Sequence, residues 1–358
     1  MLNQVTLAPV AIVDIRESGI VGYTRGAQAK ARALRDDCFA WFPAAMAPLL
    51  PGFDRLARRW LLQSRSPYLA EIEEIAHLLD FSGAWLLNGS YQWGCTTLAR
   101  DEDDVPWLAR TLDWPYSGLG RHFDVAHMRG TAGEFFSVTW PGYVGVLTGM
   151  APGRFAAAIN QGPLWRRTRR PWLRPLDIAV NAIHTWRRVR HVPPDHLLRT
   201  VFETCGDFTA ARHVLETTPI ARPAIYTLVG CKPGERCVIE RREEAGESRT
   251  HDTAAANDWR ECCEGWEARV AGDLLLTCSS EQAAQNSRAR CTALASWQGS
   301  LVRESFSWVV PPVLNPCTRV AVEMCAARGL LRVVGYEQKR ASENAQAVTA
   351  AGEVYASA

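Results

Sequence analysis

Residues 93–115 read WGCTTLARDEDDVPWLARTLDWP, in which two strand-like stretches flank an acidic turn, RDEDDVP. This pattern predicts a β-hairpin, in which a residue at the start of the first strand can face one near the end of the second. Cys95 lies at that start, and Arg110 and Asp113 follow on the second strand. The hairpin is therefore expected to bring the Arg110 guanidinium toward the Cys95 sulfur.

These residue types suit a nucleophilic cysteine. A nearby guanidinium favours the thiolate over the thiol, and the Asp113 carboxylate can hold a neighbouring amine by a hydrogen bond. The group still lacks a base. Cleavage of the Gly94–Cys95 bond would supply one, because the freed α-amino group, with a pKa of about 7.7 to 8.0, sits on the nucleophile's own residue. The alternative interpretation is a small buried cysteine with a packing role, which is the usual state of this residue.

Composition excludes several classes of protein. The chain has 358 residues, of which 47% are hydrophobic and 22% charged, and its formal net charge is +2. These values are typical of one large globular unit, or two closely packed pieces, and argue against a nucleic-acid binder. No stretch approaches the ~18 to 20 apolar residues of a membrane span, and the N-terminus lacks the pattern of a signal peptide. A cytoplasmic location is expected.

The cysteines indicate reduced thiols rather than a disulfide framework. There are 11 of them, an odd number, and Cys262 and Cys263 are adjacent. Cys231 and Cys237 suggest half of a metal clip, but no second pair of ligands follows at a spacing that suits zinc. We therefore expect neither a metal nor another cofactor.

Periodicity divides the chain at Cys95. The part before it reads as one strand, PVAIVDI, followed by helices at residues 27–50 and 68–79, whereas short apolar runs typical of strands dominate the part after it. Strands and helices are grouped rather than strictly alternating, which favours an α+β layered sandwich over a doubly wound parallel sheet. The tail, residues 341–358, is expected to be disordered. The later strands are expected at PWLARTL, FFSVTW, YVGVLT, RFAAAIN, AIYTLVG, RCVIER, DLLLT and LLRVVGYE, and the later helices at PLDIAVNAIHTWRRVR, DHLLRTVFE, DFTAARHVLE and SEQAAQNSRARCTALASW, the last with Ser280 as its N-cap.

Several blocks resemble the cysteine N-terminal-nucleophile (Ntn) hydrolases, in particular their acid ceramidase and N-acylethanolamine acid amidase branch, and more distantly the choloylglycine hydrolases. CTTLA followed by ARTLDWP is similar to the nucleophile hairpin of that family, and TWPGYVGVLTGMAPGRFAAAIN is similar to a block shared by the ceramidase branch. SPYLAEIEEIAHLLDFSGAWLLNGSYQW and ARPAIYTLVGCKPGERCVIER resemble two further blocks. Together these blocks run in order over roughly residues 65–335, which makes chance convergence improbable.

The resemblance implies a four-layer αββα sandwich and a maturation step that cuts before Cys95. The products would be residues 1–94 and 95–358, which remain together as one Ntn-hydrolase domain. Cys95 would be the nucleophile, with Arg110 and Asp113 as its supporting residues. A later arginine of the family maps to Arg288, with Arg290 as its competitor in register.

One departure from the family concerns the oxyanion. The family carries a Thr-Asn pair whose asparagine stabilises the oxyanion. In this chain the stretch LLLTCSSEQ places Cys278 at the position of that asparagine. A thiol is a weak donor, and the loss of one oxyanion donor costs about 100- to 1,000-fold in turnover. Asn286 or a backbone amide could take the role. Asn160 either contacts the substrate or caps the end of its strand.

The resulting functional hypothesis is a self-processed cysteine amidase that cleaves a small N-acyl amide through a thioester. An acyltransferase that passes the acyl group to an amine, and a catalytically retired binding homologue, are the two alternatives. The arginine-rich run at residues 165–174 reads mainly as a solvated loop, with an anionic lipid or an acidic substrate head group as the lesser alternative. Residues 39–53 read as core or pocket wall, with weak contact to a lipid surface as the alternative.

Overall fold

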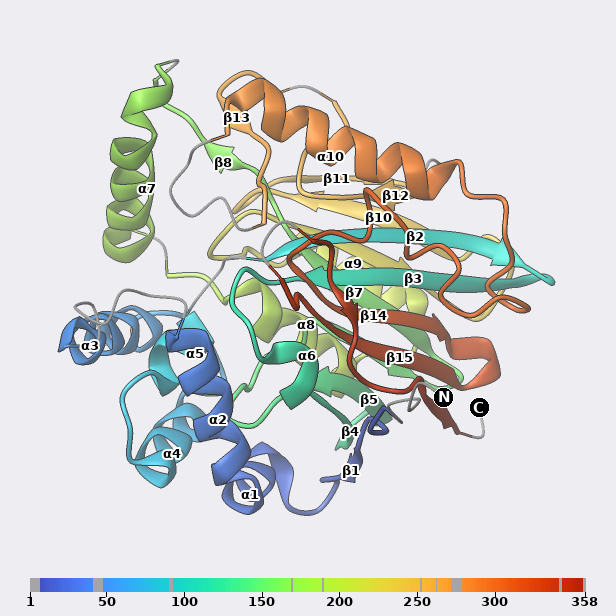
Figure 1. Cartoon of the computed structure of the whole chain (residues 1–358), viewed down its shortest axis with the longest axis horizontal. Coiled ribbons are helices and arrows are strands. Elements are labelled where there is room, and N and C mark those ends of the chain that lie inside the picture. Colours follow the sequence, from blue (N-terminus) through green and yellow to red (C-terminus); the bar gives the residue numbers. More distant parts are fainter. Residues whose placement is uncertain are drawn as a thin grey trace.

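Two β-sheets lie face to face, and helices cover the outer face of each (Figure 1). The layers are therefore helix, sheet, sheet and helix, which is the αββα sandwich that the sequence predicts. The computed structural model describes residues 7–40, 48–89, 93–168, 170–188, 190–251, 253–261, 263–271, 278–340 and 343–356.

The first sheet contains eight strands in the order β1-β4-β5-β6-β7-β9-β10-β11. Strands β1 and β4 are parallel, and the remaining neighbours are antiparallel. The strands are β1 (Ile12–Asp14), β4 (Asp124–Gly130), β5 (Gly133–Thr139), β6 (Thr148–Ala151), β7 (Phe155–Gln161), β9 (Ala224–Val229), β10 (Arg236–Arg241) and β11 (Gly246–Arg249).

The second sheet follows the order β12-β2-β3-β14-β15-β16, with β17 also paired to β15, and all of its pairs are antiparallel. A separate two-stranded ribbon joins β8 (Leu164–Trp165) to β13 (Trp266–Glu267). The strands of the second sheet are β2 (Gly94–Glu102), β3 (Val105–Asp113), β12 (Ala254–Ala255), β14 (Thr318–Cys325), β15 (Leu330–Glu337), β16 (Gln346–Ala347) and β17 (Gly352–Tyr355).

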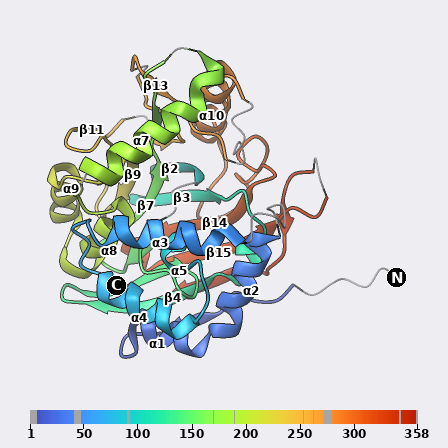
Figure 2. The same ribbon diagram turned by 90° about the vertical axis from the view of Figure 1, so that its left-hand side faces the viewer.

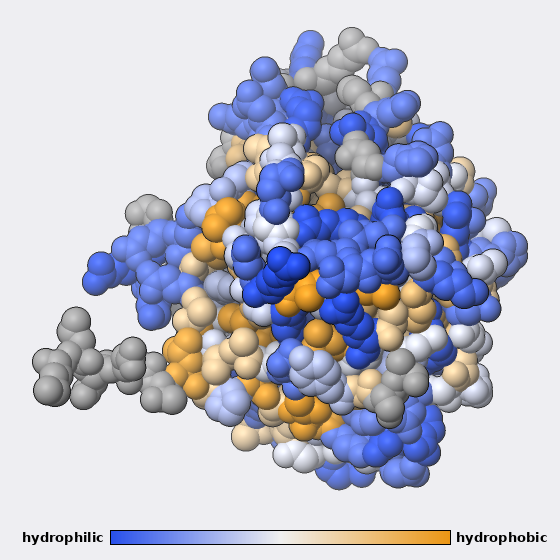
Figure 3. Space-filling view, turned by 90° about the vertical axis from the view of Figure 1, so that its right-hand side faces the viewer, coloured by the Kyte–Doolittle hydropathy of each residue, from blue (hydrophilic) through white to orange (hydrophobic). Residues whose placement is uncertain are grey.

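Helices α8 (Pro194–Thr204) and α9 (Phe208–Thr217) cover the first sheet, and α10 (Ser280–Ala295) lies across β2 and β12 on the outside of the second. Helix α7 (Arg174–Arg188) stands at the same side of the molecule as α3 (Figures 1 and 2). Figure 3 shows the opposite side, where apolar residues form scattered patches among hydrophilic ones. The remaining helices are α1 (Gly19–Gly26), α2 (Gln28–Phe39), α3 (Leu50–Leu61), α4 (Leu69–Leu79), α5 (Ala84–Gly89) and α6 (Leu119–His122).

The hairpin of β2 and β3 has a tight turn. Glu102 pairs with Val105, and Asp103 and Asp104 between them adopt left-handed backbone conformations with φ of 51° and 59°. Such a turn matches the twist of the flanking strands, and aspartate is among the few residues with a side chain that tolerate it. The acidic turn thereby fixes which residues of the two strands lie opposite each other.

Strands at the centre of the sandwich are buried on both faces. Every residue of β7 is buried, and so are nearly all residues of β3. Strands covered on both sides read as continuous apolar runs rather than as an alternating pattern. Residues 156–158 of β7 are alanines, and β7 packs against β2 of the opposite sheet. Small side chains therefore lie where the two sheets contact each other.

Some expectations need correction or fall outside the described residues. The tail is ordered in part, because β16 and β17 extend the edge of the second sheet and Val354 is buried there. The cap of α10 is Ser279 rather than Ser280, since Ser279 and Gln282 form a reciprocal capping box. Most of the expected strand YVGVLT is loop before β6. The expected strand DLLLT and residues 41–47 lie outside the described ranges.

The arginine-rich run is only partly a solvated loop. Arg166 pairs with Asp177 at 2.8 Å and also with Glu267, and Arg174 pairs with Glu267 at 2.5 Å. Both arginines are buried. These ion pairs connect α7 to the β8–β13 ribbon, which explains why Arg166 and Arg174 are buried rather than solvated. Within the described ranges, no helix has the length and apolar content required to cross a bilayer.

Candidate active site

The register of the hairpin sets the positions of the candidate residues. Gly94 lies opposite Asp113, Cys95 opposite Leu112, and Thr97 opposite Arg110. Cys95 and Arg110 are thus diagonal neighbours on one face, a spacing that a long side chain can bridge. The Arg110 Nη2 atom donates to the Cys95 sulfur at 3.1 Å.

The Arg110 guanidinium is fixed between the two sheets. It donates to the Thr148 hydroxyl of β6 and, at 3.2 Å, to the Ile159 carbonyl of β7. Arg110 is almost completely buried. A cation held by two neutral acceptors remains available to stabilise a negative charge on sulfur.

Cys95 is fully buried in the intact chain. Burial raises the pKa of the Cys95 thiol, the Arg110 guanidinium opposes this rise, and the Asp113 carboxylate adds to it. The neutral thiol is therefore favoured before any cleavage, and a base is needed to form the thiolate.

Asp113 occupies the other face of the hairpin and forms part of a buried cluster. Asn315 and Thr318 each donate to its carboxylate at 3.0 Å, and Arg290 of α10 lies 3.6 Å away. Burial raises the pKa of Asp113, and the Arg290 guanidinium opposes that rise. The cluster holds a carboxylate beside the Gly94–Cys95 bond, because Asp113 pairs with Gly94 across the hairpin.

Helix α10 presents Arg290, not Arg288, to the hairpin. The Arg290 Nη1 atom donates to the Cys95 carbonyl at 2.7 Å and to the Thr96 hydroxyl at 2.9 Å. Arg288 is exposed to solvent. Two residues that are two positions apart on a helix project in different directions, so only one of them can face the sheet. The sequence-based choice of Arg288 is corrected accordingly.

Asn257, which the sequence analysis missed, contacts both sides of the Gly94–Cys95 bond. Its Oδ1 atom accepts from the Cys95 backbone N–H at 2.8 Å and from Arg290 Nη2 at 3.1 Å. Its Nδ2 atom donates to the Trp93 carbonyl at 3.3 Å and to the Gln161 carbonyl at 2.9 Å. The only signal in the sequence is indirect: Asn257 follows β12, the short strand that pairs with β2.

Cys278 does not take the position expected for it. Its backbone carbonyl accepts a hydrogen bond from Arg174, and Asn257 supplies the amide group beside Cys95 instead. Asn286 contacts Arg290, accepting from its Nε atom at 3.0 Å. Asn160 is fully buried and connects the sheets by donating to the Ala256 carbonyl at 3.1 Å, so it does not act as a strand cap.

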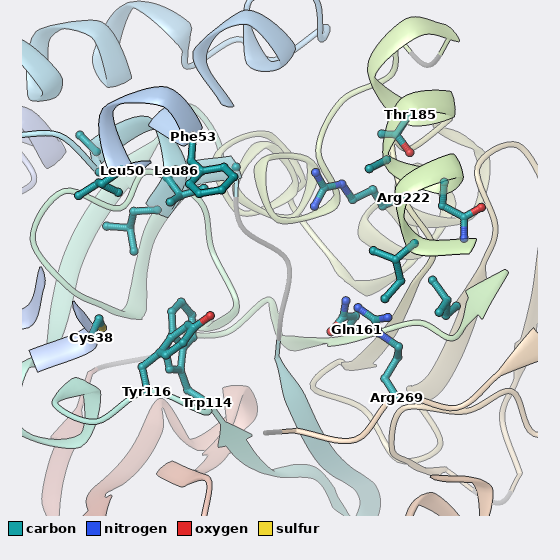
Figure 4. Close-up of a pocket in the computed structure, with 18 of the residues that line it drawn as sticks. Cys38, Leu50, Phe53, Leu86, Trp114, Tyr116, Gln161, Thr185, Arg222 and Arg269 are labelled. Atoms are coloured by element: carbon teal, nitrogen blue, oxygen red, sulfur yellow. The ribbon is translucent and has the colours of Figure 1, made fainter. Parts of the chain in front are cut away.

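A pocket of about 520 Å³ opens next to this cluster. Helices α2, α3 and α5 form one side, and α7 with the end of β7 forms the other. Its lining includes Trp114, the residue after Asp113, and Gln161, whose carbonyl is bound by Asn257. Leu50 and Phe53 of α3 face it as pocket wall (Figure 4). The volume is in the range of small-molecule sites.

The different positions of Arg290 and Arg288 predict different effects of their removal on stability. In protein kept intact by the Cys95→Ala change, Arg290→Ala is expected to lower the free energy of unfolding by about 3–5 kcal/mol, because it leaves Asp113 buried without its cation. Arg288→Ala is the matched control and should change the free energy by less than about 0.5 kcal/mol. Urea denaturation measures both. Equal effects of the two changes would contradict the placement of Arg290.

Comparison with known proteins finds relatives for part of the chain. No protein-family model matches the chain. It is 31% identical over 185 residues to the N-acylethanolamine-hydrolyzing acid amidase of Oryctolagus cuniculus, covering 50% of this chain and 48% of that protein. It is 29% identical over 111 residues to the acid ceramidase of Bos taurus, covering 30% and 25% of the two chains. The chain thus spans about half the length, or less, of these curated relatives.

Two solved structures also match the chain. A Caenorhabditis elegans ortholog of N-acylethanolamine-hydrolyzing acid amidase matches with a TM-score of 0.47 and 18% identity over 65% of this chain and 93% of that one. The conjugated bile acid hydrolase of Clostridium perfringens matches with a TM-score of 0.40 and 10% identity over 71% and 92%. By sequence, the chain is a relative of the acid amidases and acid ceramidases, and the resemblance expected from the nucleophile hairpin is confirmed.

Proposed function

We propose that this protein is a self-processed cysteine amidase that hydrolyses N-acyl amides through a thioester on Cys95. The observation that carries the proposal is the contact of 3.1 Å between the Arg110 guanidinium and the Cys95 sulfur, at the start of a strand whose first peptide bonds are held by Asn257. The names of the sequence relatives support amide hydrolysis as the reaction type.

The first reaction would be the cleavage of the chain itself. The Cys95 sulfur attacks the Gly94 carbonyl carbon, the peptide C–N bond breaks, and the nitrogen takes up a proton as the α-amine of Cys95. Water then hydrolyses the Gly94 thioester, which returns the thiol and leaves a carboxylate on Gly94. The absence of a side chain on Gly94 leaves its carbonyl open to attack. Packing also excludes a side chain there, because a Cβ atom would lie 2.4 Å from the Cβ of Ala271.

The freed amine would then serve as the base. Asn257 Oδ1 already accepts a hydrogen bond from this nitrogen at 2.8 Å in the intact chain, so the amine is positioned before it forms. The amine takes the thiol proton, the thiolate attacks the amide carbonyl, and the proton passes to the leaving amine. Water hydrolyses the acyl thioester and regenerates the enzyme.

Asn257 is also the residue we propose for the oxyanion. In the intact chain its Nδ2 atom donates to the Trp93 carbonyl, which cleavage separates from Cys95. A substrate carbonyl that takes the place of the displaced segment would receive this donor. Preorganised donors of this kind stabilise the developing negative charge in the transition state.

The two fragments are expected to stay associated. Tyr23 of α1 donates to Asp124 of β4 at 2.5 Å, and Glu71 of α4 pairs with Arg199 of α8 at 2.7 Å. Asn88 of α5 is buried and accepts from the backbone N–H of Val144 at 2.9 Å. These contacts join residues on opposite sides of the proposed cut, which supports a heterodimer of the protein's own fragments.

Acyl transfer remains the second candidate, because Cys95 is fully buried beside a mostly apolar pocket, a setting that can disfavour water as the acceptor. A competing amine such as hydroxylamine would divert the thioester and reveal this route. The structure gives a catalytically retired homologue less support than an enzyme, because Asn257 offers beside Cys95 the amide group that Cys278 lacks. A cytoplasmic location stays a prediction.

Exposed apolar side chains lie on α3 and α7, two helices that border the pocket. Phe53 and Leu56 of α3 and Leu176 and Ile183 of α7 are each close to half exposed. They would permit weak contact with a lipid surface, from which an N-acyl substrate could enter the pocket.

The experiment that tests the proposal is intact-mass measurement with N-terminal sequencing of the purified protein. We expect two fragments that co-purify, the larger one beginning at Cys95, and a covalent acyl adduct on that fragment after rapid quenching with an N-acyl amide. A persistent single chain that forms no adduct with any amide would overturn the proposal.

A further inference from the structure

Two side chains at the start of β14 bind the Asp113 carboxylate, one at each oxygen. Asn315, in the loop before the strand, donates through Nδ2 to Asp113 Oδ2 at 3.0 Å. Thr318, the first residue of the strand, donates through Oγ1 to Asp113 Oδ1, also at 3.0 Å. Asp113 and Thr318 are fully buried. A buried carboxylate thus has a donor at each oxygen, in addition to the Arg290 guanidinium at 3.6 Å.

An irregularity in the ladder brings Thr318 to this position. Val320 pairs with Leu112 of β3. Continued regularly, that antiparallel ladder would set Arg319 opposite Asp113. The register shifts between Thr318 and Val320, so Thr318 pairs with Asp113 and the Arg319 side chain donates to backbone carbonyls instead. The shift therefore sets a hydroxyl beside Asp113 where a cation would otherwise lie, and re-aiming of a side chain is a common role of such irregularities near active sites.

The hydrogen bonds around Asn315 and Thr318 fix both side chains as donors. Asn315 Oδ1 accepts from the backbone N–H of Cys317 at 2.9 Å, so the Nδ2 group is the one that faces Asp113. The Thr318 hydroxyl accepts from the backbone N–H of Asn315 at 3.0 Å and directs its single proton to the carboxylate. A proton on either Asp113 oxygen would face one of these donors. The arrangement therefore favours the ionised carboxylate over the protonated one.

The charged and titratable groups near Asp113 come from four parts of the chain. They are Arg290 of α10, Arg110 of β3, Cys95 of β2, and Cys317 before β14. Burial raises the pKa of Asp113, and Arg290, the two donors and Arg110 oppose that rise. Burial also raises the pKa of both thiols, and the Asp113 charge contributes to each rise. The two cations therefore act together with the two donors in favour of the charged carboxylate.

We propose that Asn315 and Thr318 are positioning residues that hold Asp113 ionised, as the counter-charge of the α-amine that cleavage creates. This inference rests on the proposed amidase function. Asp113 lies opposite Gly94 on the hairpin, so breakage of the bond between Gly94 and Cys95 forms the amine beside the carboxylate. When the amine takes the thiol proton, the resulting ammonium is paired with Asp113, and the proton then passes to the leaving amine. Asp113 itself neither gains nor loses a proton.

The first test uses the chain kept intact by Cys95→Ala, which contains neither the thiol nor the freed amine. Thr318→Val removes the hydroxyl from this chain with little change of shape. The hydroxyl lowers the pKa of Asp113 in the folded state, so its contribution to stability is present at high pH and fades as the pH falls. We expect the loss in urea midpoint at about pH 5 to be less than about half of the loss at about pH 8. A hydroxyl that only fills space would cost the same at both pH values.

The second test measures kcat of the processed protein with the N-acyl amide that it turns over fastest, beginning with N-dodecanoylethanolamine. Thr318→Val and Asn315→Leu should each lower kcat by about 10- to 100-fold, the effect of losing one hydrogen bond to a charged group. KM should change by less than about 3-fold, because these side chains bind Asp113 and not the substrate. Thr318→Ser retains the hydroxyl and should recover kcat to within about 3-fold of the parent.

Thr111→Val is the matched control for Thr318→Val. Thr111 is fully buried on β3, two residues before Asp113, and its hydroxyl has no hydrogen-bond partner among the described residues. Its removal should leave kcat within about 3-fold and should change the urea midpoint equally at the two pH values. The melting temperature shows whether each variant is folded.

The outcomes distinguish this inference from the proposed function. A loss of stability with Thr318→Val that is equal at both pH values, or a processed Thr318→Val protein with unchanged kcat, overturns the inference and leaves the amidase function standing. A parent chain that is never cut and turns over no amide overturns the amidase function and this inference with it.

Discussion

Replacement of Cys95 by alanine is expected to leave the protein as one uncleaved chain of 39.7 kDa and to remove amide hydrolysis. The side chain supplies the attacking atom for both reactions, and Arg110, at 3.1 Å, has no thiolate to stabilise without it. Removal of a catalytic nucleophile lowers turnover in other hydrolases by a factor on the order of 10⁴ or more. Intact-mass analysis and the release of fatty acid from a set of N-acyl amides measure the two effects.

The matched control is Cys237→Ala, because Cys237 is another fully buried cysteine, on β10, and the charged groups near its thiol are Arg212 and Glu216 of α9. This variant should be processed and should retain activity within about 3-fold. A Cys95→Ala protein that is still cut before residue 95, or that still hydrolyses the amides at the normal rate, would refute the role of the sulfur.

Replacement of Asn257 by alanine is expected to lower kcat by about 100- to 1,000-fold, the loss that follows removal of one oxyanion donor. The same change removes the acceptor of the Cys95 backbone N–H at 2.8 Å, so self-cleavage should also slow. The measurement is kcat of the processed fraction, together with the half-time of cleavage followed by gel densitometry after refolding.

Cys278→Ala is the control for this prediction, because the sequence pattern LLLTCSSEQ assigns the oxyanion group to Cys278. In the structure its carbonyl is bound by Arg174, and the cluster around Cys95 does not include it. Activity should therefore change by less than about 3-fold. The reverse order, a severe loss with Cys278→Ala and a mild one with Asn257→Ala, would restore the sequence-based assignment.

The sequence predicts the hairpin well because its determinants are local. A tight turn at Asp103 and Asp104 fixes the register, and the register alone places Arg110 diagonally opposite Cys95. The layered architecture is also predictable, since strands buried on both faces and amphipathic helices leave distinct patterns.

The rest of the candidate site depends on contacts that no local pattern encodes. Asn257 follows a strand of only two residues, β12, and reaches Cys95 because that strand pairs with β2. The sequence does not distinguish Arg290 from Arg288. Which of the two faces the hairpin depends on how α10 is rotated about its axis where it packs on the sheet. The burial of Arg166 is also not predictable from the local sequence. Its partner Glu267 is distant in the chain, and a run of arginines without such a partner is expected to be solvated.

Two contacts affect how the processed protein recovers from denaturation. Tyr23 pairs with Asp124, and Glu71 pairs with Arg199. Before the cut, refolding is a unimolecular event whose yield does not depend on protein concentration. Afterwards the same contacts join separate polypeptides, so recovery from denaturant becomes a second-order reassembly that dilution suppresses. The processed protein would therefore no longer refold efficiently, and its lifetime would depend on how slowly it unfolds.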